Sequence, residues 1–396
     1  LRDRLQQLVT SADGTVAIEE ISPGPATRWQ PPAAEPASLA VAGFDRSLDL
    51  AWRRTSYSAL TAGIHGSAEG SPGVASEPED NPIDDEPAAA FTANQTPDDR
   101  PAAEPDDASL RAMPSPMAQL PGGTGFGLVV HEVLETVDTA AVDLPAELVE
   151  RSRAVLSRRF GLSYDAAALG AALLPALTTP LGRLADGLSL ADIAPADRLA
   201  EMKFELPLAG GDDPVGAAAT VSAVADLLRS HLPPTDPFAS YADLLSGPGI
   251  EHRRLRGYLV GSLDAVLRLR SADGGHRYLV VDYKTNWLGD GRSSGEPGGE
   301  LSAWHYRPAA LAETMFAAHY PLQLLLYLVA LHRYLRWRQP DYDPADHLGS
   351  GLYLFVRGMC GPDTPVVDGT PTGVFAWSPP AGLVEALSGL LAGERP

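Results

Sequence analysis

Two aspartates and a lysine in neighbouring apolar segments form the pattern with the clearest chemistry in this chain. Asp282 and Lys284 lie one residue apart in YLVVDYKTN, residues 278–286, and Asp264 lies eighteen residues before Asp282 in GSLDAVLRL. If the two segments are adjacent strands, both carboxylates reach one point, and strand alternation puts Lys284 on the same face as Asp282. Carboxylates can hold a divalent cation beside a phosphate, and an ammonium can offset phosphate charge or polarise the attacking water. The pattern predicts metal-dependent hydrolysis of a phosphodiester.

The alternative interpretation of the D-x-K pattern is a surface ion pair on an edge strand. Val280 and Val281 precede Asp282 and indicate a buried strand. Charged side chains are costly to bury without a partner or a task, so this context favours the catalytic interpretation.

Three further polar residues lie in apolar helical segments and keep two interpretations each. His131 is four residues before Glu135, and it is either a core histidine bonded to a backbone carbonyl or a metal ligand. Gln323 and Tyr327 are four residues apart, on one face of a helix. They are either a buried polar pair or groups that touch DNA or the attacking water.

Four motifs in a fixed order carry a family resemblance. They are G-x-x-x-H (Gly127 to His131), G-x-x-D (Gly261 to Asp264), D-x-K (Asp282, Lys284) and Q-x-x-x-Y (Gln323 to Tyr327). In this order the chain resembles the RecB branch of the PD-(D/E)XK nuclease superfamily, and the segments WRRTSYSAL, DYKTNWLG and HLGSGLYLFVRGM add to the likeness over residues 1–65 and 121–396.

The resemblance implies a role for each motif residue. His131, Asp264 and Asp282 would bind the metal together with the main-chain carbonyl of Tyr283. Asp264 and Asp282 would also belong to the catalytic set, which the resemblance completes with Lys284, Gln323 and Tyr327.

The resemblance also implies an activity and partners. The expected function is that of a deoxyribonuclease that depends on Mg²⁺, for which Mn²⁺ can substitute. It would belong to a bacterial helicase–nuclease that resects double-strand breaks for recombinational repair. This enzyme is expected in the cytoplasm, associated with the nucleoid. Single DNA strands would be delivered by the helicase, with subunits of the RecC and RecD type and a RecA-type recombinase as partners. The sequence has no G-x-x-x-x-G-K-[ST] loop, so ATP use is expected only outside it. The single cysteine, Cys360, excludes an iron–sulfur cluster held by four cysteines.

Charge is unevenly distributed over the 396 residues, whose net charge is −21. Residues 66–110 hold twelve acidic residues and one basic residue, a net −11. This balance argues against capture of duplex DNA by the chain alone, and it agrees with delivery of DNA by an attached motor. No apolar run reaches membrane-spanning length, so no membrane partner is expected.

Composition and periodicity predict three regions. Residues 1–65 are expected to be the tail of a preceding helicase region, since the sequence starts at Leu1 and is expected to be a piece of a larger protein. Residues 66–120 are predicted to be an acidic disordered linker, and 121–396 the nuclease domain. The domain is expected to be α/β, with the PD-(D/E)XK nuclease fold: a central mixed sheet flanked by helices, with helical insertions. Strands are predicted at 257–270 and 276–284, joined by the turn SADGGH.

Two other functions remain open at this point. The domain could be a docking module for a recombinase or partner subunits, with catalysis secondary. It could also be a standalone structure-specific nuclease of the same superfamily. Metal-dependent cleavage of single-stranded DNA separates the docking module from both nucleases.

Overall fold

The computed structural model describes most of the chain, in two compact units. The described residues are 2–12, 15–19, 21–22, 24, 49–61, 105–159, 164–211, 218–247, 252–271, 274–289 and 300–394. The first unit, Leu1–Asp49, contains helix α1 (Arg2–Ser11), which has no buried residue. The second unit, Leu50–Pro396, contains every residue of the predicted site.

The second unit is built on a six-stranded mixed sheet. Its strands are β1 (Arg53–Thr55), β2 (Arg198–Pro207), β5 (Gly257–Arg270), β6 (His276–Lys284), β7 (Leu348–Phe355) and β10 (Val374–Trp377). The order is β1-β5-β6-β7-β10, and β2 also pairs with β5. Pairing is parallel for β1 with β5 and for β6 with β7, and antiparallel for β2 with β5, β5 with β6, and β7 with β10. The predicted mixed sheet and both predicted strands of the hairpin are confirmed.

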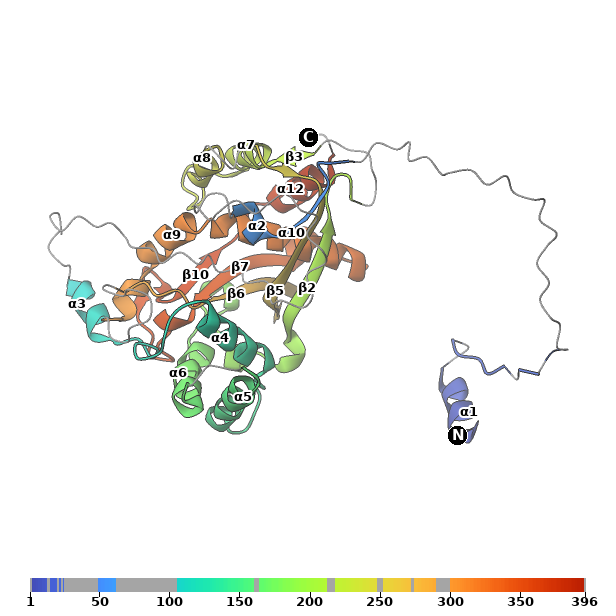
Figure 1. The fold of residues 1–396 in the computed structure, drawn as a ribbon, viewed down its shortest axis with the longest axis horizontal. Helices are drawn as coiled ribbons and strands as arrows, with labels where there is room; N and C mark the ends of the chain where they lie inside the picture. Colours follow the sequence, from blue (N-terminus) through green and yellow to red (C-terminus); the bar gives the residue numbers. More distant parts are fainter. Residues whose placement is uncertain are drawn as a thin grey trace, which may run out of the picture. The chain divides into compact units, whose positions relative to one another are not determined.

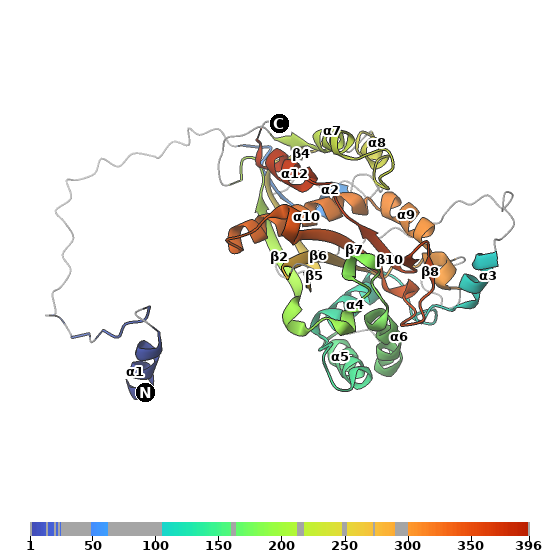
Figure 2. The same ribbon diagram turned by 180° about the vertical axis from the view of Figure 1, so that it is seen from behind.

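Helices cover both faces of this sheet (Figures 1 and 2). One face carries α4 (Thr124–Thr136), α5 (Leu144–Arg158) and α6 (Ala166–Thr178). The other carries α7 (Val221–His231), α8 (Tyr241–Leu245), α9 (Pro308–Ala317), α10 (Tyr320–Arg338) and α12 (Leu383–Ala392). Each face has its own hydrophobic cluster, so the sheet separates two cores. The smaller elements are α2 (Tyr57–Thr61), α3 (Pro105–Ala112), α11 (Pro344–His347) and two minor sheets, β3–β4 (Ala219–Thr220, Arg254–Leu255) and β8–β9 (Val366–Val367, Thr370–Pro371).

Local sequence explains where the main helices begin and end. The side chains of Asp143 and Asp165 accept hydrogen bonds from backbone N–H groups in the first turns of α5 and α6, as good N-cap residues do. Helix α10 ends at Arg338, two residues before Pro340, because the residue preceding a proline disfavours helical geometry. Its first three turns are buried almost completely, which places the apolar helix in the core beneath β6 and β7.

The packed part of the second unit reaches into the range predicted as linker. Residues 62–104 lie outside the described residues, so that part of the prediction stays untested. Residues 105–120 include α3 and the fully buried Met117. The backbone N–H of Ser115 donates to the carbonyl of Leu301, and that of Ala303 donates to Met113. Helical structure therefore begins by residue 105. Two buried apolar residues of this segment, Leu110 and Met117, stand out from its otherwise polar composition.

Residues before the linker also join the second unit. Strand β1 pairs with residues 257–259 of β5, and the hydroxyl of the buried Tyr57 donates a 2.6 Å hydrogen bond to the carbonyl of Ala318. Part of the predicted 1–65 tail thus contributes a strand and a core aromatic to the sheet domain.

In the described part of the chain, no single helix is both long and apolar enough to cross a membrane. Two sharply bent helix pairs pass the same test of length and composition together, Ala166–Thr178 with Arg183–Asp192 and Pro308–Ala317 with Tyr320–Arg338.

Candidate active site

The site lies where strands β5 and β6 stop pairing. Their ladder runs from Arg270–His276 to Ala265–Val281, and the next residue on each strand is Asp264 or Asp282. There Oδ2 of Asp264 accepts a 2.7 Å hydrogen bond from the backbone N–H of Tyr283. A side chain thus takes the place of a ladder partner, and both aspartates sit at the same end of the hairpin.

His131 reaches this point from helix α4. Its Nδ1 lies 3.3 Å from Oδ1 of Asp264, and the two side chains are 30% and 14% exposed. Its ring also packs edge-on against the ring of Tyr283, with centroids 6.1 Å apart. The buried face of α4, which includes Val130 and Leu134, fixes the helix on the sheet. Residues 131 and 264, far apart in sequence, are therefore in contact.

Lys284 and Asp282 form a buried ion pair on the opposite side of β6. Lys284 Nζ lies 2.8 Å from Asp282 Oδ2, and both side chains are at most 3% exposed. The ammonium also lies 4.3 Å from the ring centre of Tyr320 and 5.5 Å from that of Tyr353. One carboxylate and two aromatic faces hold the lysine in place.

The Q-x-x-x-Y residues lie in α10 behind this lysine. Gln323 Nε2 donates to the Tyr327 hydroxyl at 3.0 Å, and the Tyr353 hydroxyl donates to Gln323 Oε1 at 2.9 Å. Both residues of the pair are buried. The pair is thereby linked to Lys284 through Tyr353, which the sequence patterns do not single out.

The two aspartates differ in their protonation. Burial, followed by the charge of Asp264, raises the pKa of Asp282 to about 7 although Lys284 opposes the shift. Burial also acts on Asp264, but His131, Lys284 and the Tyr283 N–H together lower its pKa. Two neighbouring carboxyls cannot both hold their charge easily in a dry site, and Asp264 keeps it more readily.

Glu201 is a third acidic residue at the site, and the sequence analysis did not select it. It falls opposite Asp264 in the β2–β5 register, between the pairs Ala200–Ala265 and Met202–Leu263. Its backbone is left-handed, with φ of 49°, an uncommon conformation for a glutamate. Burial raises its pKa most, the nearby Ser262 hydroxyl lowers the pKa, and the charge of Asp264 raises it further. An acidic residue at the start of the alternating strand MKFELPL was the only signal available.

The donor set suits a hard divalent cation. Carboxylate oxygens are the ligands that Mg²⁺ and Mn²⁺ prefer, and imidazole is an acceptable addition. Burial is the main cause of the raised pKa of Asp282 and of Glu201, and the charge of Asp264 raises both further. In this conformation Asp264 contacts His131 and Asp282 contacts Lys284, and the described residues contain no group of three His, Cys, Asp or Glu side chains arranged to hold a metal. The four side chains form two adjoining pairs.

Comparison with known proteins identifies the relatives of this chain. No protein-family model matches it. It is 49% identical to the RecBCD enzyme subunit RecB of Mycolicibacterium smegmatis over 400 residues, which cover 100% of this chain and 34% of that protein. It belongs to the RecB family. RecB of Mycobacterium tuberculosis H37Rv is 46% identical over 96% of the chain, and RecB of Escherichia coli K12 is 31% identical over 69%.

The match covers most or all of this chain but only part of each RecB protein. The chain spans about a third of the length of the mycobacterial RecB proteins, 34% and 32%, and the matched part of the Escherichia coli protein is 20% of its length. The resemblance inferred from the motifs is confirmed at the level of the family. The roles of the individual site residues stay predictions.

Proposed function

We propose that this chain is a metal-dependent deoxyribonuclease with the PD-(D/E)XK fold. The observation that supports the proposal is that two pairs, His131–Asp264 and Asp282–Lys284, adjoin at the end of one β-hairpin. An acidic pair, an imidazole and a buried lysine are together the groups that metal-assisted phosphodiester hydrolysis requires.

Each residue has a distinct task in this proposal. His131, Asp264 and Asp282, with the carbonyl of Tyr283, would hold Mg²⁺ or Mn²⁺, which supplies Lewis acidity and an acidified water when bound. Lys284 would offset negative charge on the phosphate and orient the attacking water. Tyr320 and Tyr353 keep its ammonium close to Asp282 and shield it from bulk solvent.

The third acidic strand residue, Glu201, supports the same function. Glu201, opposite Asp264, adds an oxygen donor at the position where His131 and Asp264 meet. Backbone strain at such a residue is often maintained at functional sites because the surrounding structure over-determines it.

Family membership supplies the wider context of the proposal. The relatives are named as subunits of the RecBCD enzyme. We propose that this chain acts in a helicase–nuclease of that kind, in break resection and recombinational repair, on single strands unwound by the helicase. Subunits of the RecC and RecD type and a RecA-type recombinase would be its partners, and ATP would be used by residues outside this sequence.

Cleavage of a labelled single-stranded oligonucleotide by the purified 396-residue chain tests the proposal. We expect cleavage with Mg²⁺ or Mn²⁺ and none with a chelator, since the buried carboxylates need the cation. The Asp282→Asn variant is the matched negative control for contaminating nucleases. Binding of DNA without metal-dependent cleavage would overturn the nuclease assignment and favour the docking module.

A further inference from the structure

Trp304 is stacked between two arginines that come from different elements. It lies in the short 3-10 helix Ala303–Tyr306, and the guanidinium carbons of Arg111 (α3) and Arg307 lie 3.4 Å and 3.8 Å from its ring centre. At these distances both carbons lie almost directly over the ring, and two guanidinium groups cannot share that space on one face. Arg111 and Arg307 therefore cover opposite faces of Trp304.

This stack is tied to the chain segment that leaves the catalytic strand. The hydroxyl of Tyr306, two residues after Trp304, donates a 2.8 Å hydrogen bond to the carbonyl of Asn286. Asn286 lies two residues after Lys284. On the other side, the bridge between Pro114 and Ser302 joins the end of α3 to the segment before Trp304. The stack is thus connected through Tyr306 to the segment that follows Lys284.

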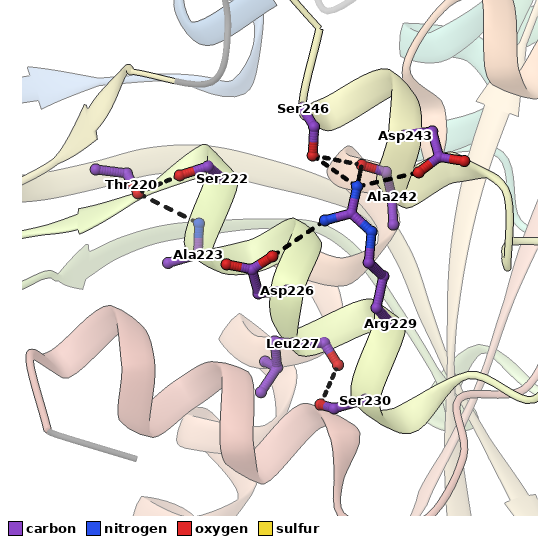
Figure 3. Close-up of polar contacts among 10 residues, drawn as sticks. All are labelled: Thr220, Ser222, Ala223, Asp226, Leu227, Arg229, Ser230, Ala242, Asp243 and Ser246. Carbon is purple, nitrogen blue, oxygen red and sulfur yellow. Dashed lines mark hydrogen bonds and ion pairs between the residues drawn. The ribbon is translucent and has the colours of Figure 1, made fainter.

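The two arginines differ from those arginines of the domain that are paired with a carboxylate. Within the described residues, neither guanidinium lies within 4 Å of a carboxylate, and the one hydrogen bond they make runs from Arg307 Nη1 to the carbonyl of Trp304. Arg229 shows the contrast, since its guanidinium is bonded to Asp226, Asp243 and Ser246 (Figure 3).

The stack carries two guanidinium charges, and the acidic residues Asp107 and Glu313 act on Arg307 from nearby. Burial lowers the pKa of Arg307 most and Arg111 lowers it further, while Asp107 and Glu313 oppose the shift. An arginine remains charged in proteins in any case. Arg111 is exposed and Arg307 is half-buried, so an anion from solution can reach the N–H donors of both guanidinium groups.

We propose that the Arg111–Trp304–Arg307 stack binds the phosphate backbone of the single-stranded DNA that the proposed nuclease site cuts. Guanidinium groups bind phosphate with paired N–H donors, and stacking on the indole holds both groups ready at little entropic cost. The chain carries a net charge of −21, so DNA needs local cations near the cut. The inference rests on the proposed function, because it names the substrate contact of the same site.

The test measures DNA affinity of the 396-residue chain with Ca²⁺ in place of Mg²⁺, so that the strand stays intact. A fluorescent oligothymidylate is titrated with the parental chain, Arg111→Ala, and the double variant Arg111→Ala/Arg307→Ala at several salt concentrations. Arg338→Ala is the matched control, since Arg338 is likewise stacked on a tryptophan, the exposed Trp337 at the end of α10.

We expect the double variant to bind about tenfold or more weakly, with the slope of log affinity against log salt reduced by about 0.7 for each phosphate that the variant no longer binds. In cleavage assays its KM should rise while kcat stays near the parental value. Arg111 is exposed and donates no hydrogen bond to a described residue, so Arg111→Ala should fold and show about half of the slope change. Arg338→Ala should match the parental chain.

Unchanged affinity and salt slope in a folded Arg111→Ala variant would overturn the inference and leave the stack as a staple between α3 and residues 303–307. An equal decrease in the affinity of Arg338→Ala would overturn it as well. If the parental chain binds DNA through the stack but does not cleave it, the nuclease proposal alone fails. If the parental chain cleaves DNA and the arginine variants bind DNA with the parental affinity, the stack proposal alone fails.

Discussion

The backbone N–H of Tyr283 donates to the carboxylate of Asp264 across the point where β5 and β6 separate. The donor is a backbone N–H group of strand β6, so the orientation of the Asp264 carboxylate does not depend on the position of another side chain. It leaves Oδ1 of Asp264 facing His131. One aspartate of the site is therefore preorganised by the backbone, whereas the other, buried Asp282, is paired with Lys284.

Removing either partner of the buried pair should abolish cleavage. We expect Asp282→Asn and Lys284→Met each to lower the cleavage rate at least about a hundredfold, since both touch the reacting groups in our mechanism. Each should also cost stability, on the order of 3–5 kcal/mol, because it leaves one buried group without its partner.

The measurement is the single-turnover rate together with urea unfolding, and Asp346→Asn, an exposed residue of α11, is the control. The double variant Asp282→Asn/Lys284→Met should recover stability but not activity. Cleavage at the parental rate by either single variant would show that the site is assigned wrongly.

Calcium should bind and fail to support cleavage. Ca²⁺ accepts looser and larger coordination than Mg²⁺, so it positions the attacking water poorly. We expect Ca²⁺ to raise the thermal unfolding midpoint but to give less than about a hundredth of the Mg²⁺ rate. Equal cleavage rates with the two ions would contradict the mechanism.

Asp282 should make stability depend on pH in the absence of divalent cations. Its pKa is raised to about 7 in the folded protein, from an ordinary value of 3.8, so the folded state binds more protons between these values. The stabilising contribution is therefore fully present below about pH 4 and is lost as pH rises through about 7, with ~1.4 kcal/mol for each unit of pKa difference.

Urea unfolding with a chelator at pH 5, 6, 7 and 8 measures this effect. Asp282→Asn cannot titrate at this position, so its stability should fall less steeply over the same range. If the free energy of unfolding changes equally with pH in the two proteins, the pKa of Asp282 is not raised. Added Mg²⁺ should stabilise the parental chain most at the upper end of this range, where the carboxylate is free of its proton.

Tyr353 should position the lysine without taking part in the chemistry. Its hydroxyl donates to Gln323, and its ring faces the ammonium of Lys284. Tyr353→Phe keeps the ring and removes the hydrogen bond, so we expect about a tenfold lower kcat with little change in KM. Tyr353→Leu, which also removes the ring, should be worse.

The control for this pair is Tyr342→Phe, which removes a hydroxyl bonded to His332. A rise in KM with unchanged kcat in Tyr353→Phe would point instead to a DNA contact. Parental kinetics in Tyr353→Leu would rule out any positioning role.

The hairpin that carries both aspartates could be predicted from sequence because its signals are local. Alternating apolar residues on both sides of SADGGH predict two strands and a turn, and the spacing of eighteen positions from Asp264 to Asp282 then places them side by side. His131 required the family motifs, since nothing local relates α4 to β5.

Glu201 could not be predicted, for a physical reason. Its place beside Asp264, 63 positions further along the chain, depends on the register of two strands and on one left-handed backbone angle. Neither the register nor this angle changes the pattern of apolar and polar residues in β2. The segment 105–120 was misjudged for a different reason, since two buried apolar residues, Leu110 and Met117, are too few to change its overall composition.

The parallel pairing of Arg53–Thr55 with β5 has a consequence for chain continuity. These residues and the buried Tyr57 are attached to the rest of the fold by contacts with residues beyond position 250, far along the polypeptide. A protease that severs the backbone anywhere between residues 62 and 104 would thus produce two pieces that co-elute, with the short amino-terminal piece behaving as a bound peptide ligand of the larger one.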